Sequence, residues 1–293
     1  MALLLSETIL KKQQRLYTIL QEHAPLLIAY SGGVDSAYLM AAAAECLSAE
    51  QFQGLIADSP SLPRRALADA QALAQERGWP LQVVETHELA DPRYVENRMD
   101  RCFFCKAELF SVMENQAQRQ GYVRLAYGEN ADDQRMIRPG SEAARQLQVL
   151  APLREANLSK QEIRLLSQSL QLPTADHHAQ PCLSSRILQG VPVTSHALGM
   201  VEQGEEILRE AGFALRRVRH SHAPPRLPEA LLQVGADEVS RLLRMKSDLL
   251  PRFRALGYGA VEVDEQGYQA PRKLSNPDEA RAASLANLRV RGL

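Results

Sequence analysis

The short stretch RCFFCK, residues 101–106, holds Cys102 and Cys105 with two residues between them. Thiols in this spacing bind metals or act as a redox pair, but zinc and iron–sulfur sites need further ligands. The chain has two other cysteines, Cys46 and Cys182. The stretch is therefore half of a metal site that another segment completes, a redox dithiol, or an accident.

A glycine-rich stretch, AYSGGVDSAYLM at 29–40, follows an apolar run and opens a helix-like segment. Ser31, Gly32 and Gly33 allow close backbone approach, and the N–H groups of a helix start bind anions. The chain has neither a Walker loop nor a GxGxxG fingerprint. The stretch resembles the PP-loop of N-type ATP pyrophosphatases, which implies ATP cleavage to AMP and pyrophosphate, with Asp35 supporting Mg²⁺ or ordering the loop. A glycine-rich turn without a ligand is the structural alternative.

Apolar runs that read as buried strands alternate with helix-like segments in the first part of the chain. These runs are 26–30, 54–58, 81–86, 123–128 and 148–153. The alternation predicts a parallel sheet with helices on both faces, and ligands bind beyond the carboxyl ends of such strands. We therefore expect an α/β, PP-loop (adenine nucleotide alpha hydrolase-like) domain over residues 1–175.

The pattern changes after residue 175, where an irregular connector rich in Pro, Gly, His and Ser begins. Helices are predicted over 197–212 and 236–257, and strands over 213–220, 231–234 and 260–264. We expect a smaller α+β domain over 176–293 that handles substrate and sulfur. Its polar tail after Pro271 is expected to be flexible.

The bulk composition narrows the class of protein. The net charge of −1, from 34 Lys+Arg and 35 Asp+Glu, provides no overall electrostatic attraction to nucleic acid. No apolar run approaches the ~18 residues of a membrane span, and the N-terminus reads as an amphipathic helix rather than a signal peptide. Four cysteines in 293 residues make no disulfide scaffold, so we expect a reduced cytoplasmic protein. We also expect a homo-oligomer.

Cys182 lies in QPCLSSRI, and here a closer resemblance emerges. The chain resembles the LarE-type ATP-dependent sulfur transferases, which build the nickel-pincer nucleotide cofactor. The matching stretches, in the family's order, are 31–36, 57–67, 101–106, 127–133, 138–144, 152–164, 182–187 and 216–220. They cover most of residues 25–220. The chain departs from the family at Glu129, where Thr is common, at His177-His178, where Lys-Pro is common, and over 221–234.

The resemblance implies two ways to supply sulfur. In one kind of family member the equivalent of Cys182 gives up its own sulfur; in the other, a CxxC pair joins it and three thiolates hold a [4Fe-4S] cluster. This chain resembles the second kind, with Cys102, Cys105 and Cys182 as ligands. Three thiolates leave one iron free to carry a labile sulfide. A redox dithiol, a zinc site with His177 or His178, and a sacrificial Cys182 remain alternatives.

Further site residues follow from the resemblance and from position. Arg217 and Arg219 share one face of a predicted strand and suit a phosphate or carboxylate, although an exposed strand face would look the same. The resemblance places the phosphate of a mononucleotide at these arginines. The other expected substrate-side residues are Arg186, Glu206, Asn130 and Asp132, of which the last two could instead cap the next segment. The expected ATP-binding residues are Ser31, Gly32, Gly33, Asp35, Ser36 and Asp58.

The resemblance implies an enzyme that uses ATP and Mg²⁺ to adenylate the carboxylates of pyridinium-3,5-dicarboxylate mononucleotide. Sulfur would then replace AMP to give thiocarboxylates, with Cys182 and Asp35 as the catalytic residues. The rivals are a PP-loop tRNA thiolase, a glutamine-dependent amidotransferase subunit, and a non-catalytic iron–sulfur or sulfur carrier. The absence of further CxxC pairs weighs against the thiolase. The carrier would not need a PP-loop.

Overall fold

A computed structural model describes residues 5–135, 139–176, 181–222 and 225–268. Its larger sheet is parallel throughout, with the strand order β3-β2-β1-β4. The strands are β1 (Leu26–Ala29), β2 (Phe52–Asp58), β3 (Leu81–Glu85) and β4 (Arg124–Tyr127). Each overlaps a segment that the sequence predicts as a strand, although β2 begins two residues earlier than the predicted 54–58, so the parallel α/β architecture is confirmed.

The central strand β1 explains why this sheet needs helices on both faces. All four of its residues are buried, and neighbouring side chains point to opposite faces. Leu26 and Ile28 belong to one apolar core, whereas Leu27 and Ala29 belong to another. A parallel strand of this kind is stable only when both faces are covered.

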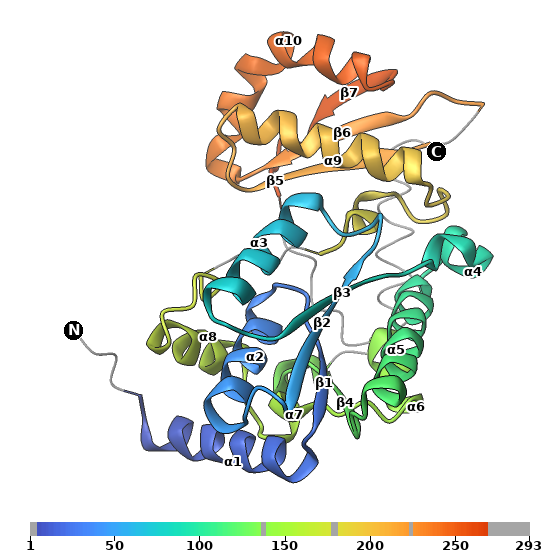
Figure 1. The fold of residues 1–293 in the computed structure, drawn as a ribbon. Helices are drawn as coiled ribbons and strands as arrows, with labels where there is room; N and C mark the ends of the chain where they lie inside the picture. Colours follow the sequence, from blue (N-terminus) through green and yellow to red (C-terminus); the bar gives the residue numbers. More distant parts are fainter. Residues whose placement is uncertain (1–4, 136–138, 177–180, 223–224, 269–293) are drawn as a thin grey trace.

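The covering helices divide between the two faces as Figure 1 shows. One core contains side chains of α1 (Glu7–His23), α2 (Val34–Cys46), α3 (Arg64–Glu76), α7 (Pro152–Glu155) and α8 (Lys160–Ser169). The other core contains side chains of α5 (Arg101–Gln120) and α6 (Pro139–Gln146). The short α4 (Pro92–Val95) leads into α5.

The prediction of a fifth strand for this sheet, at 148–153, was wrong. Only Leu150 pairs with β4, through an isolated bridge to Ala126. The chain then enters α7 with Pro152 in its first turn. Proline lacks the N–H that a ladder requires and suits a helix start, which ends the extended segment.

A second, smaller sheet is mixed and has the order β5-β6-β7. Its strands are β5 (Arg216–Ser221), β6 (Glu229–Val234) and β7 (Ala260–Val263), and its helices are α9 (Ser195–Glu210) and α10 (Val239–Ala255). Val218, Leu232 and Phe253 share one buried core with α9. The predicted α+β elements are confirmed, and in Figure 1 they form the upper part of the molecule.

The boundary between the two parts, drawn at 175/176, stays a prediction. Residues 177–180, which include His177 and His178, lie outside the described residues, as does the tail from 269. None of the helices in the described ranges is both long and apolar enough to cross a membrane.

Candidate active site

The carboxyl ends of the parallel strands open into a cavity of about 1000 Å³. The segments that line it come from both parts of the chain. They include the end of β1 with residues 30–36, residues 55–57 with 59 and 61, residues 105, 106 and 109 on α5, and Pro181, Cys182 and Tyr268. The cavity therefore lies where open α/β sheets bind ligands, and it brings the glycine-rich loop and two cysteines together.

The glycine-rich loop turns sharply between β1 and α2. Gly32 has φ +71°, and a Cβ there would lie 2.8 Å from the Cβ of Ala70, so a side chain has no room. Ser36 Oγ accepts from the N–H of Ser31 and donates to the carbonyl of Gly33, both at 3.1 Å. The N-cap, Gly33, has no side chain to satisfy the first N–H groups of α2. These groups remain suited to a phosphate.

Asp35 lies in the first turn of α2 and lines the cavity. Its Oδ2 accepts from Nζ of Lys160 at 2.6 Å, whereas its buried Oδ1 has no hydrogen-bond partner among the described residues. A buried carboxylate oxygen without a partner is costly. Asp35 could therefore hold a Mg²⁺ ion, because hard cations prefer oxygen ligands.

Two of the predicted cluster cysteines, Cys105 and Cys182, line the cavity, whereas Cys102 is exposed. Cys102 and Cys105 lie three residues apart on α5 and so share a face. Burial, followed by the charge of Cys182, raises the pKa of Cys105 to about 12. Within the described residues, however, no group of three or more His, Cys, Asp or Glu side chains is arranged to hold a metal ion. The donors suit a cluster chemically, but their separations here do not form the complete site.

Lys106, the last residue of RCFFCK, also lines the cavity. Its ammonium lies 5.5 Å from the ring centroid of Phe110 and 5.8 Å from that of Tyr127, and burial lowers its pKa. It has no ion pair or hydrogen bond to any described residue. Glu129, the departure from the family pattern, instead bonds Arg154 Nη1 at 2.6 Å. Lys106 is thus a cation available to an anion in the cavity.

Arginine side chains hold the short turn that carries Cys182. Arg186 is buried, pairs with Glu205 at 2.8 Å, and donates from Nη1 to the carbonyl of Cys182 at 2.9 Å. Arg219 donates from Nη1 to the carbonyl of Ser185 at 2.7 Å. The structure therefore places both arginines on the backbone beside Cys182, and their contact with substrate stays a prediction.

Arg217 lies on the same strand face as Arg219, as the sequence predicts, and is buried. Its guanidinium carbon lies 5.3 Å from the ring centroid of Tyr268, which lines the cavity. Burial, and then the charge of Arg186, lower the pKa of Arg217. An anionic ligand would stabilise the charged guanidinium against this burial and repulsion, so Arg217 suits a phosphate.

The remaining predicted residues make local contacts. Asn130 Oδ1 accepts from the N–H of Asp132 at 2.9 Å, and Asp132 Oδ2 accepts from the N–H of Lys160 at 2.9 Å. Glu206 pairs with Arg209 on its own helix at 2.5 Å. The first two contacts order the loop after β4 and the start of α8. The predicted substrate roles of these residues stay untested.

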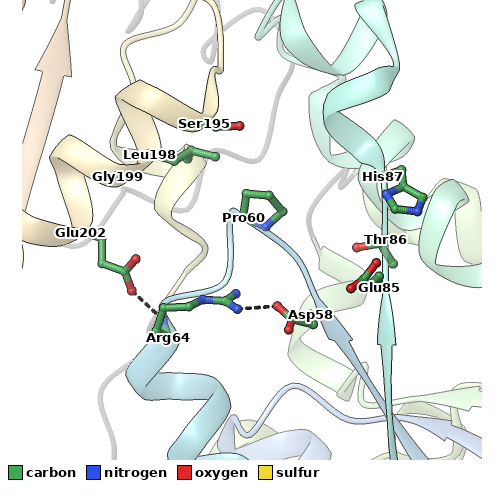
Figure 2. Close-up of a pocket in the computed structure, with 10 residues that line it drawn as sticks. All are labelled: Asp58, Pro60, Arg64, Glu85, Thr86, His87, Ser195, Leu198, Gly199 and Glu202. Atoms are coloured by element: carbon green, nitrogen blue, oxygen red, sulfur yellow. Dashed lines mark hydrogen bonds and ion pairs between the residues drawn. The ribbon is translucent and has the colours of Figure 1, made fainter.

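Asp58 faces a different cavity, of about 460 Å³, shown in Figure 2. There it pairs with Arg64, whose own N–H donates to Oε1 of Glu202 at 2.5 Å. Its neighbours Ala57 and Ser59 line the larger cavity. The backbone at the end of β2, rather than the Asp58 side chain, is therefore available to a ligand there.

Sequence reasoning missed five charged residues of the cavity: Asp69, Glu76, Glu88, Lys106 and Lys160. Glu88 is buried and accepts from the hydroxyls of Ser61 at 2.7 Å and Thr86 at 2.9 Å. The two lysines lie inside stretches already recognised as motifs, RCFFCK and NLSKQEIR, which was the available signal. Glu88 carries no local pattern that marks it.

Comparison with known proteins gives relatives but no match to a known family profile. An uncharacterised protein of Synechocystis is 40% identical over 246 residues, 83% of this chain and 90% of the relative. The pyridinium-3,5-bisthiocarboxylic acid mononucleotide synthase of Lactiplantibacillus plantarum is 27% identical over 284 residues, 95% and 99% of the two chains. An uncharacterised protein of Methanocaldococcus jannaschii is 23% identical over 264 residues, 89% and 98%.

Proposed function

We propose that this chain, which is 27% identical over 95% of its length to a pyridinium-3,5-bisthiocarboxylic acid mononucleotide synthase, is a LarE-type sulfur transferase. It would convert the carboxylates of pyridinium-3,5-dicarboxylate mononucleotide to thiocarboxylates. The reaction consumes ATP and belongs to nickel-pincer cofactor biosynthesis. The name of the Lactiplantibacillus relative describes the synthesis of the corresponding bisthiocarboxylic acid mononucleotide. Two rounds of sulfur transfer would produce each molecule of product.

The proposed first step forms an acyl adenylate. A substrate carboxylate oxygen attacks the α-phosphorus of ATP, and the bond to the β-phosphate oxygen breaks to release pyrophosphate. The N–H groups at the start of α2 bind the departing phosphates. Asp35 would hold a Mg²⁺ ion, which would supply positive charge to them when bound. Lys106, which lines the same cavity, contributes positive charge to the phosphoryl oxygens, where negative charge is carried during the reaction.

In the second step sulfur attacks the activated carbonyl carbon, and AMP leaves with the electrons of the broken C–O bond. If Cys182 is the donor, its sulfur bonds to the carbonyl, and cleavage of its Cβ–S bond with loss of the α-proton leaves dehydroalanine. A [4Fe-4S] cluster held by Cys102, Cys105 and Cys182 would instead supply a labile sulfide. We favour the cluster because the chain contains all three thiols in the family's positions.

The single observation that supports this function is the shared cavity. The PP-loop residues, Cys105 and Cys182 line one space, although Cys182 lies almost 150 residues after the loop. A sulfur atom must reach the carbonyl carbon of an acyl adenylate, which the other carboxyl oxygen joins to the phosphorus of AMP. A non-catalytic sulfur carrier would need no nucleotide loop beside its thiols.

Anaerobically prepared protein tests the proposal. Incubation with ATP, Mg²⁺ and the dicarboxylate mononucleotide should release pyrophosphate and increase the substrate mass by the replacement of oxygen with sulfur. Iron and acid-labile sulfide should copurify with the protein. Replacement of Cys102, Cys105 or Cys182 with serine should remove both. Dehydroalanine at position 182, with activity retained in a Cys102→Ser, Cys105→Ser double variant, would instead identify Cys182 as the donor. Absence of pyrophosphate release would refute the reaction itself.

A further inference from the structure

We propose that Asn97 and Arg101 are positioning residues that keep the helix of Cys102 and Cys105 in register with the turn of Cys182. This inference deepens the proposed function and rests on it for its catalytic consequence. The relative position of the two thiol-bearing segments can be measured without any assay of enzyme activity.

Arg101 is the first residue of α5 and directly precedes Cys102. Its Nη1 donates to the carbonyl of Ser184 at 2.8 Å and also to Oδ1 of Asn97. Ser184 lies two residues after Cys182 and is fully buried. One guanidinium nitrogen therefore joins the start of the CxxC helix to the Cys182 turn.

Asn97 extends this connection to the residues that follow the turn. It is 2% exposed, and its Nδ2 donates to the carbonyls of Leu188 and Val191, both at 2.9 Å. Its own carbonyl accepts from the N–H of Gly190 at 3.2 Å. Its φ of +55° is a left-handed conformation that asparagine tolerates better than most residues. Position 97 thus needs this backbone shape and these donors together.

Apolar packing and another hydrogen bond reinforce the same connection. Tyr94, in α4, is buried with its hydroxyl 2.6 Å from Oγ of Ser184. Tyr94, Leu183 and Ile187 belong to one apolar cluster, and Cys105 packs against it. The segment that leads into the CxxC helix and the turn that carries Cys182 are therefore packed against each other.

The contacts of Arg101 and Asn97 end on main-chain carbonyls close to Cys182, not on the PP-loop. Their loss should let the two thiol segments move relative to each other while the nucleotide end keeps its shape. Misplacement of a reacting group by about 1 Å can reduce turnover by about 100-fold. The expected defect is thus in sulfur transfer and not in ATP binding.

Thiol cross-linking measures the register directly. A Cys46→Ser, Cys102→Ser protein retains only Cys105 and Cys182, and dibromobimane becomes fluorescent when it bridges two nearby thiols. Adding Arg101→Gln should lower the bridging rate by about tenfold, as expected for the loss of a charge-assisted hydrogen bond. The matched control is Arg98→Gln, because Arg98 is exposed and pairs only with surface Glu96 among the described residues.

Kinetics of the four-cysteine protein provide the second readout. Arg101→Gln should lower the turnover of thiocarboxylate formation with an unchanged KM for ATP, and Arg101→Lys should restore part of it. Asn97→Asp, which keeps the backbone preference but removes the donors, should reproduce the defect if Arg101→Gln folds poorly.

Equal bridging rates in the parent and in folded Arg101→Gln or Asn97→Asp, or no bridging in the parent, would overturn the inference. Slower bridging in a protein whose parent releases no pyrophosphate would uphold the register and refute the proposed function. The two failures are therefore distinguishable.

Discussion

The two ends of the cavity are built in different ways. At the phosphate end, Ser31, Gly33 and Ser36 hold one another through bonds that span at most five residues. At the thiol end, Arg101 bonds Ser184 across 83 residues, and Asn97 bonds Leu188 across 91. The turn at the phosphate end is a local motif, although Lys160 reaches Asp35 there from 125 residues away. The thiol end is held by hydrogen bonds between distant segments.

This difference predicts separable failures. A local turn costs little conformational entropy to close, whereas a long-range contact forms only after the chain has folded around it. Damage at the phosphate end should stop ATP cleavage and leave the thiols in place. Damage at the thiol end should stop sulfur transfer and leave the nucleotide loop intact.

The largest effect is expected from Cys182→Ser, which should abolish thiocarboxylate formation whether sulfur comes from a cluster or from Cys182 itself. Pyrophosphate release should persist, because serine perturbs none of the PP-loop contacts. Mass spectrometry of the nucleotide measures sulfur transfer, and a pyrophosphate assay measures ATP cleavage. Cys46→Ser, a change in the helix after the loop, is the control and should retain both activities. Thiocarboxylate made by Cys182→Ser would contradict the assignment.

Asp35→Ala should impair ATP cleavage and leave the thiol end of the cavity unchanged. Loss of the carboxylate that contacts Lys160 should lower pyrophosphate release by about 100-fold or more, the usual size for removing an electrostatic group from a reacting phosphate. The alkylation rate of Cys182 should not change. A thermal melt checks folding, and Asp248→Ala, a change at an exposed position of α10, serves as the control. Unchanged pyrophosphate release in folded Asp35→Ala would refute the PP-loop assignment.

Arg217→Ala and Arg219→Ala should distinguish substrate binding from support of the Cys182 turn at the thiol end. Each should weaken use of the mononucleotide more than ATP binding, by about tenfold or more for a charge-assisted contact of roughly 1.5–3 kcal/mol. Arg219→Ala should also lower turnover, because Arg219 holds the carbonyl of Ser185. Steady-state KM and kcat for each substrate separate the two. Equal losses for ATP and mononucleotide would argue against a substrate role.

The last effect concerns stability rather than activity and involves His220, because burial of its ring lowers the pKa of this histidine to about 4. Between its ordinary value and that value, the unfolded chain binds a proton that the folded chain does not, so stability falls as pH falls through this window. At 1.36 kcal/mol per pH unit, the loss is roughly 2 kcal/mol between pH 6.5 and about pH 5. His220→Phe should lack this component.

Urea unfolding near pH 7.5 and near pH 5 tests this effect in His220→Phe, in the parent protein and in exposed His87→Gln. The histidine at position 220 packs against Tyr258, with ring centroids 5.6 Å apart, so phenylalanine should fit. The same pH dependence in all three proteins would show that His220 does not contribute.

Most of the fold was predictable because its signals are local. The apolar runs at β1, β2, β3 and β4 were long enough to read, and the glycine-rich turn marks the end of β1. The run at 148–153 has the same composition but forms only one bridge, because Pro152 starts a helix. Apolar composition reports burial, and it cannot by itself distinguish a strand from a buried connection.

The sequence by itself showed which groups are available for chemistry: a glycine-rich loop suited to a phosphate, three thiols in two segments, and arginines on one face of a strand. Tertiary structure decided which groups share the cavity. It placed Cys105, Lys106 and Glu88 beside the loop, turned Asp58 toward a second cavity, and put Arg186 and Arg219 on the Cys182 turn. Side-chain direction depends on what packs against each residue, and those partners lie far away along the chain.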